Sequence, residues 1–207
     1  MERRGFTIPE MLVVCFLAII VLFLIVGLLF PSFSMFRTQS AASDAQQSAL
    51  LFMHEMNTGL LNTLLETVTI GSDPIAISYQ VVQEANSFSA ADGSPLMSDT
   101  FVVVHYDSGR RMVLMEDCEV PPGDESQPRR LSVAELQSVI SEVSGEERVL
   151  ARHVEDLKIT DHDEDLALLN PPVRLTITCT VDISAGGAIK EERYQMTTLV
   201  TPRSVRY

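Results

Sequence analysis

The sequence predicts an α+β fold in which a long, kinked N-terminal helix, transmembrane in its first half, packs on an antiparallel β-sheet head. Three observations support this prediction. The twenty residues Met11–Phe30 carry no charge. Apolar residues then recur at steps of three and four as far as Val68, which is the spacing of a helical face. Much of the remaining chain alternates apolar and polar residues with period two, as half-buried strands do.

Composition limits the possible functions. The chain has 207 residues and a formal net charge of −13, and this length accommodates one ordinary domain plus an extra element. Its acidic balance argues against nucleic-acid binding, which needs clustered Lys and Arg to neutralise phosphates. Its three cysteines are too few for a disulfide-dense mini-protein or a four-cysteine zinc site.

The apolar run Met11–Phe30 predicts a membrane span. As a helix it would be about 30 Å long, which is the thickness of the hydrocarbon core of a bilayer. Arg3 and Arg4 before the run place the N-terminus on the cytoplasmic side. Because the run is followed by Leu28-Leu29-Phe30-Pro31-Ser32-Phe33 rather than a small-x-small cleavage site, we expect the run to be retained and any processing to precede it.

The first residues carry the sharpest motif. The stretch Arg4-Gly5-Phe6-Thr7-Ile8-Pro9-Glu10 resembles the type IV prepilin motif, which has a basic leader, Gly before the cut, Phe after it and Glu as the fifth mature residue. The resemblance implies that a prepilin peptidase cuts between Gly5 and Phe6 and that Phe6 is then N-methylated. Pro9 departs from the family pattern, where many members have Leu or Ile.

Glu10 is the only charged residue between Arg4 and Arg37. A carboxylate at the edge of hydrocarbon costs a few kcal/mol or more unless it is paired. Its own helix N-terminus supplies part of the compensation. The stronger partner that we expect is the cationic Phe6 amine of a neighbouring subunit, and the alternative is an interfacial charge that snorkels to lipid headgroups.

The helix should continue beyond the membrane to about Thr69, where Gly71-Ser72-Asp73-Pro74 would end it. Pro31, together with Gly27, should kink or loosen it. The predicted apolar stripe on its second half consists of Ala42, Ala45, Ala49, Met53, Met56, Leu60, Leu64 and Val68.

Strands and one short helix account for the rest of the chain. The predicted strands are Ile75–Val82, Phe101–Tyr106, Met112–Glu116, Val173–Ile183 and Ile189–Thr201. Asp107-Ser108-Gly109-Arg110 is predicted to be a hairpin turn, as is Ala185-Gly186-Gly187. Glu119–Arg130 is expected to be a loop, and Ser132 with Glu135 forms a capping-box pattern that opens a helix to about Val143.

The head adds a second resemblance. Tyr106-Asp107-Ser108-Gly109-Arg110, Val149–Leu157 and the two long closing strands resemble the J-type minor pseudopilins of type II secretion and related large minor pilins. Together the resemblances imply a pilin-like architecture with a cleaved leader at 1–5, a transmembrane or filament-core helix at 6–36, its amphipathic half at 37–70 and a sheet head at 71–207.

Few residues offer chemistry beyond assembly. Asp161, Asp163 and Asp165 are candidate calcium ligands, although the spacing is not that of an EF-hand and a solvated acidic loop is the alternative. Cys118 and Cys179 lie in the outward part of the chain, where they could form a disulfide or remain free. The histidines lack zinc-site spacing, and no nucleophile or phosphate-loop motif occurs, so we expect neither an enzyme nor an obligatory cofactor.

The predicted function is therefore that of a structural minor pilin or pseudopilin, anchored by one span in the bacterial inner membrane with its head outside the cytoplasm. The resemblance implies as partners other pilin or pseudopilin subunits, the prepilin peptidase and the inner-membrane platform of the assembly machinery. The alternative is a signal-anchored periplasmic or extracellular domain that binds a ligand or acts as a sensor.

Overall fold

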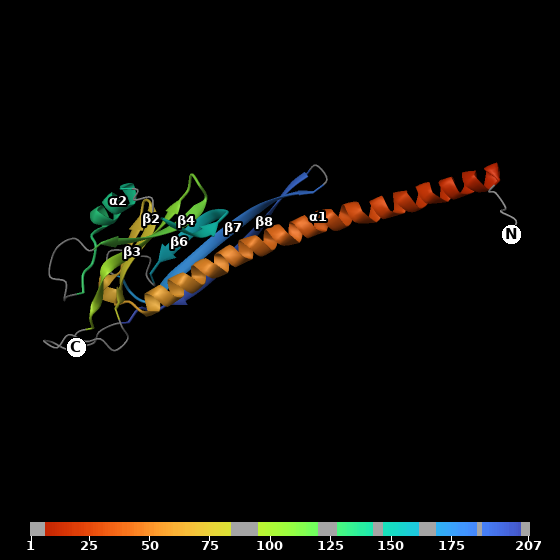
Figure 1. The fold of residues 1–207 in the computed structure, drawn as a ribbon. Helices are drawn as coiled ribbons and strands as arrows, with labels where there is room; N and C mark the ends of the chain where they lie inside the picture. Colours follow the sequence, from red (N-terminus) through yellow and green to blue (C-terminus); the bar gives the residue numbers. More distant parts are fainter. Residues whose placement is uncertain are drawn as a thin grey trace.

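The computed structural model describes residues 7–83, 95–119, 128–142, 147–161, 169–185 and 188–203. A single long helix, α1, extends far beyond a head built of strands and one short helix (Figure 1). The elements are α1 (Ile8–Leu61), the 3-10 turn η1 (Leu65–Thr67), β1 (Thr69–Ser72), β2 (Ile75–Val82), β3 (Met97–Asp107), β4 (Met112–Glu119), α2 (Val133–Ser141), β5 (Arg148–Arg152), β6 (Val154–Thr160), β7 (Val173–Ala185) and β8 (Ala188–Val200). The predicted α+β class is confirmed.

The strands form two antiparallel sheets. One has the order β1-β2-β3-β4-β5 and the other β6-β7-β8. The chain passes between them at His153, which adopts a left-handed backbone with φ 59°. Its carbonyl accepts a hydrogen bond from the Thr180 N–H at 2.8 Å, and the Val154 N–H donates to the Arg111 carbonyl at 2.9 Å. These two bonds tie the sheets together where they meet.

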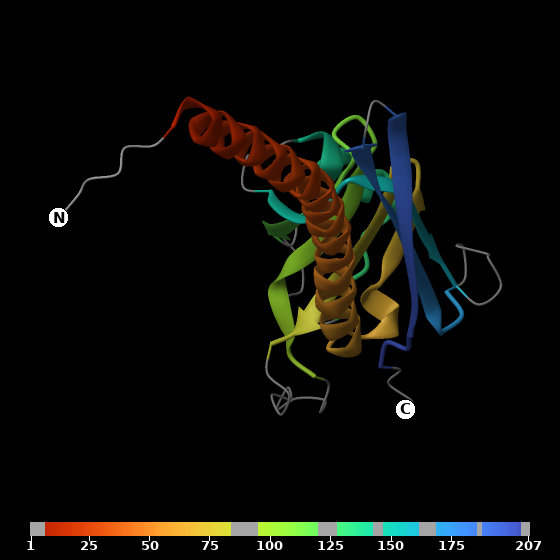
Figure 2. The same cartoon turned by 90° about the vertical axis from the view of Figure 1, so that its right-hand side faces the viewer.

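The main hydrophobic core lies between the second half of α1 and the inner faces of the sheets. Six residues of α1 are buried there: Ala45, Ala49, Phe52, Met53, Met56 and Leu60. They meet alternate residues of β7, including Leu175, Ile177 and Cys179, all 0% exposed. The predicted stripe is confirmed from Ala45 to Leu60, while Ala42 is only partly buried and the buried Leu64 and Val68 lie beyond the helix. The predicted alternation is confirmed from Val173 to Cys179, and beyond it Thr180 is buried and Val181 is partly buried. Figure 2 shows the orange half of α1 against the head and the red half outside it.

A smaller core lies under α2. Leu131 and Leu136 pack on Ala76, Phe101 and Val103 of the five-stranded sheet. The predicted capping box is confirmed, since the Glu135 carboxylate accepts from the Ser132 N–H at 2.8 Å and the Glu135 N–H donates to the Ser132 hydroxyl at 3.2 Å. Helix α2 ends at Ser141, two residues before the predicted end.

The predicted strands are present. Strand β2 has the predicted bounds, and β3, β4, β7 and β8 contain or closely match the others. At the predicted hairpin turn the Arg110 N–H donates to Asp107 Oδ1 at 3.0 Å. Glu119 belongs to β4, while most of the predicted loop after it and the glycines of the predicted second turn lie outside the described residues.

Helix α1 ends at Leu61, so the prediction that it continues to about Thr69 is wrong. The Asn62 carbonyl accepts from the Val82 N–H at 2.9 Å, and the Thr63 hydroxyl donates to the Gln80 carbonyl. After Leu61 the backbone therefore bonds to β2 in place of continuing the helix. Threonine favours this change, because it is β-branched and its hydroxyl can bond to backbone groups outside the helix. Gly71 and Ser72 end β1, and Pro74 precedes β2. These residues connect two strands and do not end a helix.

Pro31 lies inside α1 without interrupting it. Neighbouring hydroxyls bond to helix carbonyls there: Ser32 Oγ donates to the Leu28 carbonyl and Ser34 Oγ to the Pro31 carbonyl, both at 2.8 Å. Figure 2 shows the helix axis changing direction between its outer half and the half on the head. The helix is thus bent, as expected, but it remains continuous.

Candidate functional site

The first candidate site is the N-terminal end of α1. The predicted cleavage residues Gly5 and Phe6 lie outside the described residues, which begin at Thr7. Thr7 is the N-cap of α1, and Glu10 is the third residue of the helix. Glu10 Oε2 accepts two hydrogen bonds from Thr7, one from its N–H at 2.9 Å and one from its hydroxyl at 2.8 Å. The carboxylate is therefore held at the positive end of the helix dipole, in the geometry of a capping box.

The Thr7–Glu10 pair is a feature that the sequence reasoning missed. Its signal was present, because Thr-x-x-Glu directly before an apolar helix is the sequence pattern of a capping box. The pair adds a local reason for a carboxylate at this position. It also uses only one carboxylate oxygen, since the hydrogen bonds described for Glu10 all involve Oε2.

The second candidate site is the apolar surface of α1. Every residue from Ile8 to Arg37 is exposed. The most apolar stretch of the helix has a mean hydropathy of 3.5, and none of that stretch is buried inside the molecule. Within the described part of the chain, α1 is the one helix long and apolar enough to cross a membrane. Such a surface in water would be unfavourable by about 25 cal/mol per Å², and it is compatible with a single-pass membrane anchor.

The acidic residues considered for calcium are only partly described. Asp163 and Asp165 lie outside the described residues. Asp161 is 1% exposed, and its Oδ2 accepts from the Asn170 N–H at 3.1 Å. Among the residues that the structure describes, none forms a hydrogen bond with its buried Oδ1. The visible role of Asp161 is to hold the backbone at Asn170, and no cluster of three His, Cys, Asp or Glu residues suited to a metal occurs among the described residues.

The two cysteines considered for a disulfide are free thiols in the structure. Cys179 belongs to the main core, whereas Cys118 packs at the edge of the small core under α2. Burial raises the pKa of both thiols to about 11, and at Cys118 the nearby carboxylates of Glu116 and Asp117 add to the effect. The sequence left open whether these two cysteines form a disulfide or remain free, and in the structure they are free.

A charged cluster that the sequence did not indicate joins the β3–β4 turn to the start of β5. Glu147 lies 3.8 Å from His105 Nε2 and 3.7 Å from Arg110 Nη1. Arg110 also lies 3.5 Å from Asp107. His105 is 7% exposed. The residues come from two segments, 105–110 and Glu147, that are distant in sequence, so no sequence spacing could reveal the cluster, and its geometry is that of a structural network.

Comparisons with protein-family models, with curated proteins and with solved structures gave no match for this chain. Function has therefore to be inferred from the N-terminal motif and from the arrangement of α1 on the head.

Proposed function

We propose that the chain is a structural minor subunit of a type IV pilin-like filament, either a type IV pilus or the filament of a type II secretion system. A prepilin peptidase would cut between Gly5 and Phe6, and the mature subunit would assemble through α1. The observation that carries the proposal is the ordered motif of basic leader, Gly5, Phe6 and Glu10 in front of twenty uncharged residues. The wholly exposed outer half of α1 supports it.

The two halves of α1 suit two successive environments. The outer half is apolar on all sides, as expected for a helix surrounded by lipid. Other apolar helices offer a comparable environment, so transfer from the membrane into a filament core would change its burial little. The inner half is buried along one stripe only and carries the head with it. One continuous helix thus connects the buried core of an assembly to a folded head outside it.

Glu10 would give this assembly its register. Cleavage after Gly5 would expose the Phe6 amine as a new cation, and a carboxylate at the edge of hydrocarbon is stabilised strongly by a cation that shares its low-dielectric surroundings. Thr7 occupies Oε2 only, which leaves Oε1 for the amine of a neighbouring subunit. The prepilin peptidase, other pilin or pseudopilin subunits and the inner-membrane assembly platform are the partners in this proposal.

Processing tests the proposal directly. Protein extracted from membranes of cells that contain the peptidase should begin at Phe6 and carry one added methyl group at its amine, measured by mass spectrometry. Gly5→Val places a branched side chain where an extended backbone must enter a protease groove, so this variant should keep its leader. A wild-type chain that begins at Met1 in the same cells would instead support the signal-anchored binding or sensor domain.

Assembly tests the role of Glu10. Glu10→Ala and Glu10→Gln should insert into membranes normally, because neither change makes α1 more polar. Both should lose incorporation into the filament, measured by cross-linking to neighbouring subunits, because both remove the charge. Glu66→Gln, an exposed change on the head, is the matched control. Normal incorporation of Glu10→Gln would show that the carboxylate is not the assembly determinant.

A further inference from the structure

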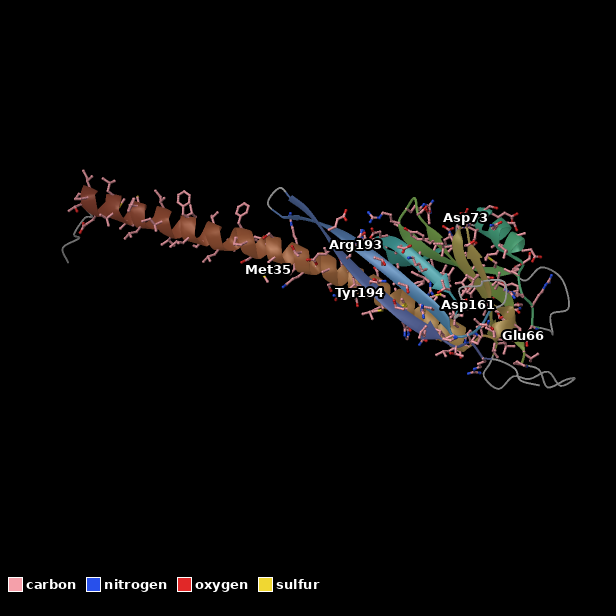
Figure 3. All side chains as sticks on the ribbon, turned by 180° about the vertical axis from the view of Figure 1, so that it is seen from behind. Met35, Glu66, Asp73, Asp161, Arg193 and Tyr194 are labelled. Carbon is pink, nitrogen blue, oxygen red and sulfur yellow. The ribbon has the colours of Figure 1, made fainter. Side chains whose placement is uncertain are left out.

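Helix α2 covers the face of the five-stranded sheet that points away from α1. Figures 1 and 3 show α2 on the far side of that sheet from α1, and Figure 3 places the labelled Asp73 beside it. The side chains of β3 alternate between the two faces of the sheet. Val102 and Val104 belong to the main core, whereas Phe101 belongs to the small core under α2. The two cores therefore lie on opposite faces of one sheet.

Few apolar contacts hold α2 in place. We define the α2 cover as residues 128–142, which are α2 and the described residues on either side of it. Its two buried side chains are Leu131 and Leu136, at 3% and 1% exposed, and Val139 and Ile140 are partly buried against the same small core. The other residues of the cover are exposed or partly exposed. None of the cover belongs to the main core as the structure describes it.

Side chains make the hydrogen bonds that join the α2 cover to the sheet. With the donor named first, these bonds are Gln137 Nε2 to the Asp73 carbonyl at 2.7 Å, Thr69 Oγ1 to the Leu131 carbonyl at 2.5 Å, the Arg129 N–H to Gln80 Oε1 at 3.1 Å and Arg130 Nε to Thr69 Oγ1 at 3.3 Å. Among the described residues, no backbone N–H of one part bonds to a backbone carbonyl of the other. Removal of the cover would therefore break no bond of the strand ladders.

We propose that the α2 cover opens as a unit of its own while the rest of the head stays folded. A segment with few buried contacts and no share in the sheet ladder needs less free energy to open than the core does. The open state keeps the five-stranded sheet, because α1 and the second sheet still pack on its other face. This inference concerns the head alone and does not depend on membrane anchoring, cleavage or filament assembly.

Opening uncovers an apolar surface that the closed head hides. Ala76, Phe101 and Val103 are each 0–1% exposed under the cover, and their main partners from the cover are Leu131 and Leu136. When the cover leaves, these three side chains face water on the side of the head away from α1. The head thus has a closed state and an open state that differ in one apolar patch.

Hydrogen exchange of the full chain in detergent micelles tests the opening. A backbone amide exchanges when its hydrogen bond opens, either locally or with the whole domain. Peptides from α2 should exchange at least about tenfold faster than peptides from the paired residues Val173–Cys179 of β7. Mass spectrometry after timed dilution into deuterated water measures both. Equal protection of α2 and β7 would overturn the inference.

A variant of the main core separates opening of the cover from unfolding of the head. Ile177→Val removes one methylene from a side chain that is 0% exposed and should favour global unfolding by about 2- to 12-fold. Exchange of β7 should accelerate by that factor, whereas exchange of α2 should stay unchanged, because the open state keeps the main core. Acceleration of α2 by the same factor as β7 would show that the cover opens only with the whole head.

The matched variant lies in the cover. Leu136→Ala should accelerate exchange of α2 by about thirtyfold or more, up to complete loss of its protection. The β7 peptides should stay protected, and the chain should still melt cooperatively, because the worst result of this change is a head whose cover is open. Loss of protection throughout the head in Leu136→Ala would overturn the inference, since the cover would then be part of one cooperative core.

Discussion

At the scale of single residues, the contact between Gly59 and Tyr79 fixes how closely α1 approaches the sheet. A Cβ added to Gly59 would overlap Tyr79 Oη and lie 2.7 Å from Cζ. Tyr79 is 2% exposed, and burial raises the pKa of its hydroxyl well above the ordinary value. The rigid ring cannot move aside as a flexible chain would, so the helix needs a glycine at this position.

Gly59→Ala should therefore destabilise the head although alanine is the better helix former. The gain in helix propensity is about 1 kcal/mol, whereas forcing extra atoms into a packed core costs typically 1–3 kcal/mol. Thermal melting of the purified chain measures the net effect. Gly27→Ala, which meets nothing within 4 Å, is the control and should not lower the melting temperature. Adding Tyr79→Phe should recover part of the loss, and an unchanged melt of Gly59→Ala would contradict the packing.

The two head thiols should react slowly in the folded chain. With a pKa of about 11 against an ordinary 9.0, the thiolate fraction at pH 8 is reduced roughly a hundredfold. Because the thiolate is the reactive form, alkylation of Cys118 and Cys179 should accelerate about tenfold per pH unit between pH 8 and 10. Mass spectrometry after timed iodoacetamide treatment measures the rates, with the denatured chain as control. A peptide linking Cys118 to Cys179 in protein from an oxidising compartment would contradict free thiols.

At the scale of elements, α2 is a short helix whose start is fixed by its cap. Leu136 is the one buried residue within this nine-residue helix, so packing alone anchors it weakly. Ser132→Ala removes the capping hydroxyl and should lower stability by about 1 kcal/mol. Ser138→Ala, exposed in the middle of the same helix, is the control and should be neutral or slightly stabilising. Denaturant unfolding compares the two, and equal effects would show that the cap is unimportant.

The same cap predicts a dependence on pH. Hydrogen bonds from the Ser132 N–H and hydroxyl hold the pKa of Glu135 below its ordinary 4.5. A lowered folded pKa means that the stabilisation is fully present above 4.5 and is lost as the pH falls through the folded value. The stability difference between wild type and Glu135→Gln should therefore shrink below pH 4.5. Melting curves between pH 3 and 7 test this, and a difference that grows toward acid would refute it.

The elements that the sequence predicted well are those whose own pattern is strong. Strand β7 alternates over its whole length, and α1 has both an apolar run and a spaced stripe. Strands β5 and β6 were not predicted, because they have five and seven residues and join through His153 in a left-handed conformation, which no local pattern requires. The end of α1 was misplaced because the bonds that stop it come from Gln80 and Val82, distant in sequence.

The same distinction between local pattern and tertiary contact applies to the candidate site. Glu10 was identifiable because an isolated charge at the edge of an apolar run is unusual, and the Thr7–Glu10 pair was readable from its spacing. The network of His105, Arg110 and Glu147 depends on two segments, distant in sequence, meeting in space. It could not be obtained before the tertiary structure was known.

At the scale of the whole molecule, one helix carries an exposed apolar surface, which is the proposed membrane or filament contact, and also forms part of the core of the head. Every residue of its outer half, from Ile8 to Arg37, is exposed, whereas its inner half supplies Phe52, Met56 and Leu60, each 0% exposed. The boundary between these roles lies near Thr38. The outer half should therefore be removable without loss of the fold, and the inner half should not.

Two truncations test this division. A chain of residues 37–207 keeps the whole buried stripe, while a chain of residues 62–207 loses Phe52, Met53, Met56 and Leu60. Burying each of these side chains is worth about 1.5–3 kcal/mol, so together they contribute about 6–12 kcal/mol, comparable with the 5–15 kcal/mol that typically stabilises a domain. The first chain should be soluble without detergent and melt cooperatively by circular dichroism, and the second should show no cooperative transition. Cooperative melting of residues 62–207 would mean that the sheets fold without α1, and the helix would then be an anchor attached to an independent domain.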